Sequence, residues 1–131
     1  MSRTVVLFMG ILALVGLCFA PAFAGMEAPQ DPITMMVPDG EKATKPPVVF
    51  PHASHGDLEC TACHHTWDGS SDIMKCKSSG CHDLYPDKKG EQSYYRSYHA
   101  STEGSCLGCH RIKRKAKEPY GPTSCKQCHA E

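Results

Sequence analysis

The sequence contains few of the residues that fill ordinary protein cores. From residue 25 onward it has ten Leu, Ile, Val and Phe residues in 107 positions. This fraction of about 9% is far below the roughly 20% under which chains tend to be disordered. Burying so few side chains cannot offset the conformational entropy that folding removes. Two interpretations remain: a disordered segment, or a domain whose core is something other than side chains.

The sequence also has no excess of charge of either sign. It contains 14 Lys and Arg residues and 14 Asp and Glu residues. Non-specific nucleic-acid binding depends on a positively charged surface that contacts phosphates. We therefore expect no nucleic-acid partner.

One apolar run is present at residues 5–19, between Arg3 and the small-x-small segment Ala22-Phe23-Ala24. A positive residue, a short apolar run and a small-x-small site are typical of a secretory signal peptide. The run is shorter than the roughly 20 residues of a transmembrane helix. Bulky Leu17 precedes Cys18, where lipoprotein processing needs a small residue.

We therefore expect residues 1–24 to be a signal peptide that is cleaved near Ala24. The mature protein, residues 25–131, is then a single periplasmic domain that does not itself span the membrane.

What the sequence does contain is a regular set of cysteine pairs. The eight cysteines beyond residue 24 form four pairs, and a histidine follows each pair directly. Cys-x-x-Cys-His is the attachment motif of c-type haem, in which two thiols bond to the porphyrin and the histidine reaches the iron. The pairs are Cys60/Cys63, Cys76/Cys81, Cys106/Cys109 and Cys125/Cys128, followed by His64, His82, His110 and His129.

The second motif has four residues between its cysteines instead of two. Among these four, Ser78, Ser79 and Gly80 are residues that favour a turn. We expect the extra length to loop out without disturbing attachment.

Zinc sites, disulfides and redox dithiols are the other uses of cysteine pairs. Zinc sites do not require a histidine after the second cysteine of each pair, and neither do disulfide scaffolds. Four repeats that use every cysteine of residues 25–131 favour four covalent haem c groups. The haems would then form the core that side chains cannot supply, and the apoprotein would be largely unfolded.

The histidines match the haems in number. Beyond the four in the motifs, the chain has one further histidine for each haem: His52, His55, His65 and His99. We therefore expect bis-histidine ligation, although Met35, Met36 and Met74 are alternative ligands. Two imidazoles close the iron to substrate and give a lower reduction potential than His/Met ligation.

The order of these motifs resembles the tetrahaem cytochrome c3 family of sulfate-reducing bacteria over essentially all of residues 25–131. The resemblance rests on four stretches and the last two attachment motifs. The stretches are Val48-Val49-Phe50-x-His52-x-x-His55, Cys60-x-x-Cys63-His64-His65, Cys76 to His82, and Tyr94-Tyr95-x-x-Tyr98-His99.

The resemblance implies a small, mostly α-helical and irregular multihaem fold, with short helices and a small N-terminal β-hairpin wrapped around four haems. It places Phe50 between two haems. Some family members have a long spacer in the fourth motif, whereas this chain has a short one. The implied ligand pairs are His52 with His64, His65 with His82, His55 with His110, and His99 with His129.

Local composition predicts a few elements. Residues 34–37 and 47–50 have strand-like composition, and the turn-prone residues 38–40 separate them. The attachment motifs are expected to form short helices, the clearest at 104–117, which residues 118–122 end. Residues 25–33 form a loose arm.

A basic run beside the last two motifs is a candidate docking patch. The alternative is a solvated charged face. Eight ionised propionates and four ferric centres would give the oxidised holoprotein a net charge of roughly −5, on which a positive patch steers an acidic partner. Its residues are Arg111, Lys113, Arg114, Lys115, Lys117 and Lys126, and a second cluster comprises Lys75, Lys77, Lys88 and Lys89.

The function implied is electron transport. The resemblance places the patch around the fourth haem, where it docks periplasmic hydrogenase; electrons then pass to membrane multihaem cytochromes or other redox proteins. We expect coupled proton uptake, a monomer and no enzymatic activity. The alternative is a multihaem reductase, which needs an open haem site. The sequence assigns no role to Trp67.

Overall fold

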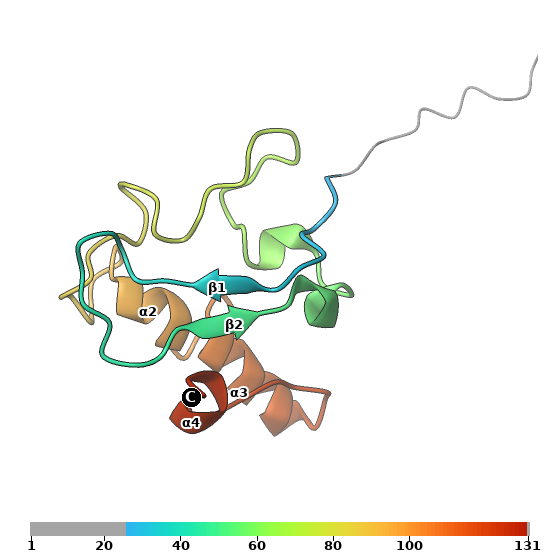
Figure 1. Cartoon of the computed structure of the whole chain (residues 1–131). Coiled ribbons are helices and arrows are strands. Elements are labelled where there is room, and N and C mark those ends of the chain that lie inside the picture. The colour runs from blue at the N-terminus through green and yellow to red at the C-terminus, as the bar shows by residue number, and fades with distance from the viewer. Residues whose placement is uncertain (1–25, 131) are drawn as a thin grey trace, which may run out of the picture.

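Short elements joined by long irregular segments make up the chain (Figure 1). The computed structural model describes residues 26–130. The predicted signal peptide 1–24 and its cleavage point lie outside the described residues. No helix of residues 26–130 is long and apolar enough to cross a membrane. The elements are β1 (Ile33–Met35), β2 (Val48–Phe50), the 3-10 helices η1 (His52–His55) and η2 (Cys60–Ala62), and the α-helices α2 (Tyr94–His99), α3 (Cys106–Ala116) and α4 (Cys125–Cys128).

The two strands form a small antiparallel sheet. Ile33 pairs with Phe50, and Met35 pairs with Val48. The segment between the strands turns where the backbone N–H of Glu41 donates to the carbonyl of Pro38. The predicted strands and turn are confirmed, but the connection covers residues 36–47 and is too long for a tight hairpin.

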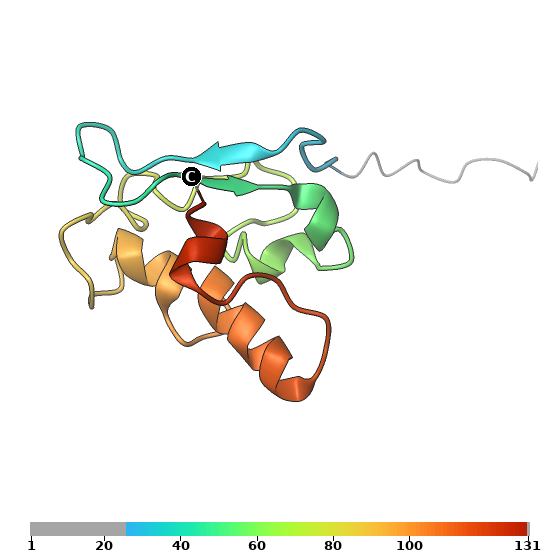
Figure 2. The same ribbon diagram turned by 60° about the horizontal axis from the view of Figure 1, so that its bottom comes forward.

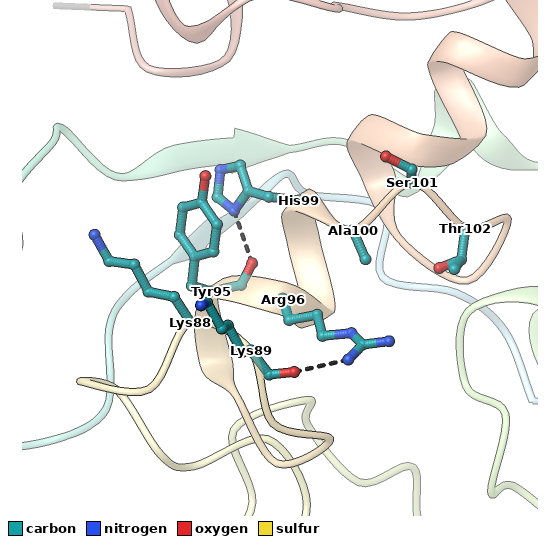
Figure 3. Close-up of a pocket in the computed structure, with 8 residues that line it drawn as sticks. All are labelled: Lys88, Lys89, Tyr95, Arg96, His99, Ala100, Ser101 and Thr102. Carbon is teal, nitrogen blue, oxygen red and sulfur yellow. Dashed lines mark hydrogen bonds between the residues drawn. The ribbon is translucent and has the colours of Figure 1, made fainter.

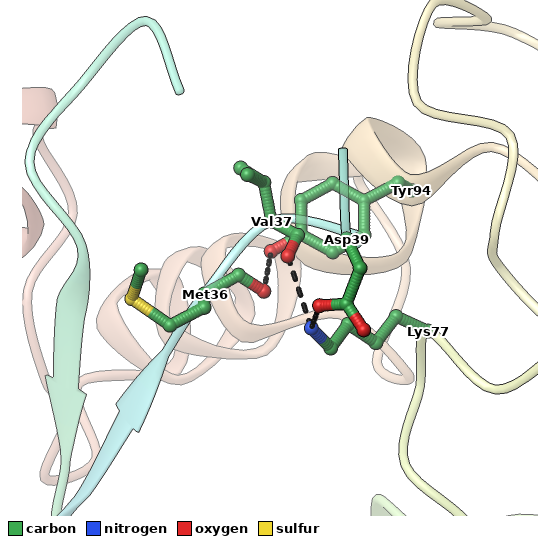
Figure 4. A network of polar contacts seen from close by, with 5 residues as sticks. All are labelled: Met36, Val37, Asp39, Lys77 and Tyr94. Carbon is green, nitrogen blue, oxygen red and sulfur yellow. Dashed lines mark hydrogen bonds and ion pairs between the residues drawn. The ribbon is translucent and has the colours of Figure 1, made fainter. Parts of the chain in front are cut away.

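Side chains from distant segments fix this connection (Figure 4). The ammonium group of Lys77 donates to the carbonyl of Val37 at 3.0 Å and lies 3.4 Å from the carboxylate of Asp39. The hydroxyl of Tyr94 donates to the carbonyl of Met36 at 3.1 Å. The spacer of the second motif and helix α2 therefore both hold the connection in place.

The two longest helices begin at buried serine caps. The hydroxyl of Ser93 accepts a hydrogen bond from the backbone N–H of Arg96, and Ser105 accepts one from Gly108. Each bond satisfies a backbone donor that the first helical turn leaves unpaired. Helix α3 ends at Lys117, whose φ of 63° is left-handed. The helix predicted at 104–117 is confirmed.

Helices α2 and α3 pack against each other, and Gly108 of α3 lies against the segment that follows α2. A Cβ added at Gly108 would overlap the carbonyl oxygens of Ala100 and Thr102. Only glycine allows this approach, so the third attachment motif is held directly against the segment that follows His99.

The sheet and the helices occupy opposite sides of the molecule, with α2, α3 and α4 beneath β1 and β2 in Figure 2. Within residues 26–130 no apolar side chain is fully buried. The buried polar side chains are Ser93, 0% exposed, and Ser105, 3% exposed. Packing of apolar side chains therefore does not hold this fold together, as the composition predicts.

Candidate haem-binding sites

Each attachment motif folds so that its histidine returns to its first cysteine. The backbone N–H of His64 donates to the carbonyl of Cys60 at 2.9 Å, and His129 donates to Cys125 at 2.9 Å. In the third motif the whole segment lies within α3. The motif therefore forms a single helical turn that presents two thiols and an imidazole together.

The second motif keeps the same closure despite its longer spacer. The N–H of His82 donates to the carbonyl of Cys76 at 2.9 Å. The additional residues form a turn in which Cys81 N–H donates to Ser78, and Gly80 adopts a φ of 81° that favours glycine. The predicted turn is confirmed, whereas the short helix expected at every motif is absent from this one. The extra length bulges out instead of winding.

The thiols of the motifs lie close enough to affect each other's ionisation. All eight cysteines of the described residues are free thiols. Burial raises the pKa of the Cys63 thiol, and the thiols of Cys109 and Cys76 raise it further. The Cys106 side chain is solvent-accessible, but the surrounding protein and the nearby Cys63 raise its pKa to about 11. Thiols of different motifs therefore lie near one another.

Three pairs of histidine rings face each other at nearly equal separations. The ring centres of His55 and His110 are 6.1 Å apart, and the planes differ by 24°. The rings of His65 and His82 are 6.0 Å apart at 51°. The rings of His99 and His129 are 6.2 Å apart at 10°. Two imidazoles that bind one metal from opposite sides, each at about 2 Å, place their ring centres roughly 6 Å apart.

The remaining two histidines, His52 and His64, are also neighbours. Burial lowers the pKa of His64, and the positive charge of a protonated His52 lowers it further. Both effects favour the neutral imidazole, which is the form that binds a metal. His52 Nδ1 is buried without a hydrogen-bond partner.

Backbone carbonyls orient five of the eight rings. Because a carbonyl only accepts, each bonded Nδ1 carries the proton and leaves the Nε2 lone pair available to a metal. This donor set fits an iron porphyrin bound from both faces. The contacts are His55 with Pro51 at 3.2 Å, His82 with Glu91 at 2.8 Å, His99 with Tyr95 at 2.9 Å, His110 with Pro122 at 2.7 Å and His129 with Pro46 at 2.7 Å.

The ring of His110 also rests on a glycine. A Cβ added at Gly121 would lie 2.5 Å from Cε1 of His110. The sequence indicates only that residues 118–122 end a helix. A close approach of this kind requires the folded arrangement and leaves no separate signal in one sequence.

Phe50 lies between two of the histidines. Its ring centre is 4.9 Å from that of His52 and 4.6 Å from that of His55. Strand β2 directs the phenyl ring toward η1, on which both histidines lie. The two histidines are three positions apart, and η1 places both on one helical turn.

Helix α2 carries His99 at the edge of an open hollow (Figure 3). Beside His99 is an open hollow of about 530 Å³, lined by Lys88, Lys89, Tyr95 and Arg96 among others. Tyr95 stacks on the His99 ring with centres 4.3 Å apart. The lysines here belong to the second cluster and not to the predicted docking patch.

The predicted docking patch lies on α3, at its C-terminal cap and on α4. Two of its residues have partners: Lys113 forms a 3.1 Å ion pair with Glu118, and Arg114 donates to the Thr123 hydroxyl at 3.1 Å. Arg111, Arg114 and Lys115 line a second hollow with Thr123. The positive side chains thus form two separate surfaces.

Trp67 belongs to a loop with its own hydrogen bonds. Its indole N–H donates to the carbonyl of Ser71 at 2.7 Å. The Asp68 carboxylate accepts from the backbone N–H groups of Ser70 and Ser71 and from both hydroxyls. These bonds hold the pKa of Asp68 well below its usual range. The loop is therefore held by its own hydrogen bonds, and the indole of Trp67 links its start to Ser71.

The arrangement does not resemble a zinc site. Across residues 26–130, no group of three or more His, Cys, Asp or Glu side chains converges to hold a metal ion. Structural zinc sites take four such ligands in a tetrahedron. The histidines meet in pairs instead, which suits axial ligation of a planar macrocycle.

Known proteins resemble this chain over most of its length. Residues 29–129 match the class III cytochrome c family. The chain is 43% identical over 105 residues to a cytochrome c3 of Desulfovibrio desulfuricans, and the aligned region covers 79% of this chain and 97% of that protein. It is 43% identical over 107 residues to a cytochrome c3 of Maridesulfovibrio salexigens, and the aligned region covers 79% of this chain and 96% of that protein.

The fold is similar to a solved structure of the same kind. The di-tetrahaem cytochrome c3 of Desulfovibrio gigas superposes with a TM-score of 0.74 at 32% identity, over 81% of this chain and 100% of that one. The expected small, irregular multihaem fold is confirmed. The chain belongs to the class III cytochrome c family, and it is a multihaem electron carrier whose cofactors are four haem c groups.

Proposed function

We propose that this protein is a low-potential periplasmic electron carrier in which two histidines bind each haem iron. The observation that carries the proposal is the facing of three histidine pairs at 6.0–6.2 Å. The pairs come from segments far apart in the sequence. A shared separation that suits one metal between two rings has no reason to arise three times in histidines that only fill space.

The assignment of ligands follows these pairs. Each motif's two cysteines would hold one haem covalently, and its histidine would bind the iron. The pairs that would bind each iron are His65 with His82 for the second haem, His55 with His110 for the third and His99 with His129 for the fourth. The remaining pair, His52 with His64, would bind the first.

The chain's own residues set the conditions for electron transfer. When bound, each haem iron takes up and releases one electron, between the ferric and ferrous states. Hydrogen bonds from Nδ1 to backbone carbonyls hold the rings in place and raise the basicity of Nε2. A more basic ligand favours the ferric state, so these bonds support a low potential. Two imidazoles on each iron leave no position for substrate, which argues against enzymatic activity.

Electron uptake is proposed to be coupled to proton uptake. Haem propionates lie near the irons, and added negative charge raises the pKa of a nearby acid. Reduction potentials should then fall as the pH rises. Potentials that stay constant between about pH 5 and 8 would contradict this coupling.

The proposed partners are periplasmic hydrogenase as electron donor and membrane multihaem cytochromes or other redox proteins as acceptors. Two positive surfaces support docking of acidic partners: the patch Arg111, Lys113, Arg114, Lys115, Lys117 and Lys126, and the lysines beside His99. Opposite charges steer association and are screened by salt. Reduction by hydrogenase should therefore slow as ionic strength rises, and a rate independent of salt would contradict the docking proposal.

The proposed location follows from the first 24 residues. We propose that they form a cleaved signal peptide and that residues 25–131 are the mature domain. The family match begins at residue 29, downstream of the proposed cleavage point. In this proposal all eight cysteines of the domain serve haem attachment, so none is left for a disulfide between chains. We further propose that the carrier is a monomer. Intact mass of the exported holoprotein tests the cleavage site.

Two assays on the holoprotein test the proposal. A pyridine haemochrome assay should give four haem c groups per chain. The reduced protein should not bind carbon monoxide, because every iron has two histidine ligands. Binding of about one carbon monoxide per chain would instead favour a multihaem reductase with an open site.

A further inference from the structure

A stack of three side chains connects solvent to the proposed ligand of the fourth haem. The rings of Tyr95 and His99 are stacked with centres 4.3 Å apart and planes 10° from parallel. The Tyr95 carbonyl also accepts from His99 Nδ1 at 2.9 Å. One residue therefore fixes the His99 ring twice, through its backbone and through its phenol ring (Figure 3).

A lysine covers the same tyrosine ring. The ammonium nitrogen of Lys88 lies 5.5 Å from the centre of the Tyr95 ring, within the range of a cation–π contact. Because His99 occupies one face of Tyr95, Lys88 lies over the other. The Tyr95 side chain is 44% exposed, and Lys88 is exposed. A partner can therefore reach Lys88 directly, and Lys88 is only one ring from His99.

The turn that carries Lys88 is fixed by hydrogen bonds. The Asp87 carboxylate accepts from the backbone N–H groups of Lys89 at 2.9 Å and Gly90 at 2.8 Å. These bonds, with the nearby Arg96, keep the pKa of Asp87 below its usual range. The turn is therefore closed on itself by an ionised carboxylate.

Two further bonds fasten this turn to helix α2. The buried hydroxyl of Ser93 donates to the Asp87 carbonyl at 2.6 Å, and the Arg96 guanidinium donates to the Lys89 carbonyl at 2.7 Å. The base of Lys88 is thus held rigidly to the helix that carries His99. A change at the ammonium group acts on Tyr95 without loosening the turn.

We propose that the Lys88–Tyr95–His99 stack makes the reduction potential of the fourth haem depend on whether an acidic protein is docked at Lys88. The proposal rests on the assignment of His99 to the fourth haem. In the free protein, the Lys88 charge stabilises the added electron. An acidic partner surface neutralises that charge and draws the ammonium away from Tyr95. The fourth haem of the complex then has a lower reduction potential than in the free protein.

The magnitude is modest because the charge is separated from the iron by two rings. Coulomb's law at an intermediate dielectric gives an effect of about threefold in the one-electron equilibrium over such a distance. This corresponds to about 30 mV, because a tenfold change is about 59 mV for one electron.

The test uses the full holoprotein with poly-L-glutamate as the acidic probe at low ionic strength. NMR of the haem methyl groups during a redox titration follows each haem separately. In the native protein, poly-L-glutamate should weaken reduction of the fourth haem by about threefold and change the other three less. An equal change at all four haems, or none, overturns the proposal.

Four variants separate the stack from simple charge. Lys88→Gln should abolish the probe-induced change, because it removes the charge. Tyr95→Leu keeps every charge but removes the ring that positions the ammonium beside His99, so it should reduce the change. Tyr95→Phe keeps the ring and should preserve it. Lys89→Gln is the matched control, because it removes one charge from the same turn and should also preserve the change.

A probe-induced change that persists in Lys88→Gln, or that is lost equally in Lys89→Gln, overturns the role of the stack. Should Tyr95→Leu fail to fold, Lys88→Arg replaces it, since arginine restores a cation over the ring and should preserve the change. Carbon monoxide binding by reduced His99→Ala, compared with the native protein, tests the assignment of His99 separately. A result showing that His99 is not the ligand is therefore distinguishable from a result showing that Lys88 and Tyr95 do not affect the fourth haem.

Discussion

The imidazole rings of His99 and His129 lie 6.2 Å apart and within 10° of parallel. A backbone carbonyl holds each ring, from Tyr95 on α2 and from Pro46 on the connection between the strands. The fourth attachment motif, helix α2 and the connection between β1 and β2 thus meet at one proposed iron site. The fold and the ligand pair depend on each other.

Removing one ring of this pair should open the fourth iron. We predict that reduced His99→Ala binds about one carbon monoxide per chain, because a five-coordinate iron has a free axial position. The native protein should bind none. Carbon monoxide titration followed by visible absorption measures the difference. A variant that still binds none would show that another side chain, and not His99, is the ligand.

The contact between Gly121 and His110 should be equally specific. Gly121→Ala places a Cβ against the His110 ring, so the ring must move. We predict a changed EPR signal for the third haem only, with a loss of stability of about 1–3 kcal/mol. Gly104→Ala is the control, because a Cβ there meets nothing within 4 Å. If the two variants behave alike, Gly121 does not position His110.

Lys77 should stabilise the connection between β1 and β2. Its ammonium group is half-buried and donates to the Val37 carbonyl. Lys77→Met should reduce the free energy of unfolding by about 1.5–3 kcal/mol, the contribution of a hydrogen bond to a charged group. Thermal denaturation of the oxidised holoprotein measures this. Lys75→Met, at an exposed position nearby, should leave the stability unchanged.

The loop at Trp67 should respond to acid. Hydrogen bonds from Ser70 and Ser71 hold the pKa of Asp68 below its usual range. A depressed pKa means that the carboxylate stabilises the folded loop above the unfolded pKa of about 3.9. This contribution is lost as the pH falls through the lower folded value.

The indole N–H signal of Trp67 reports on that loop by NMR. It should stay unchanged down to about pH 4 and shift only in stronger acid. Asp68→Asn should show the acid form of the signal at neutral pH. A native signal that moves with a midpoint at the ordinary carboxyl pKa would contradict this account.

The sequence alone predicted the parts that depend on spacing. Cys-x-x-Cys-His and a matching number of histidines are local patterns with one dominant chemistry. The bulge of the second motif followed from Ser78, Ser79 and Gly80. The lack of an apolar core followed from composition.

The contacts between distant segments could not be predicted in this way. Gly121 under His110, Lys88 over Tyr95 and Pro46 beside His129 each join segments whose separation in space depends on the whole fold. The second motif was expected to contain a helix, but its longer spacer closes the same hydrogen bond without one. Trp67 had no interpretable pattern, because its partner is a backbone carbonyl, which every residue has.

The central claim is that every iron has two histidine ligands. Near-infrared magnetic circular dichroism of the fully oxidised holoprotein, measured per haem, tests it most directly. The account predicts a single low-spin charge-transfer band at the position of bis-imidazole haem, with an intensity equal to four such haems. A His/Met band, a high-spin band, or an intensity of three haems or fewer would contradict it.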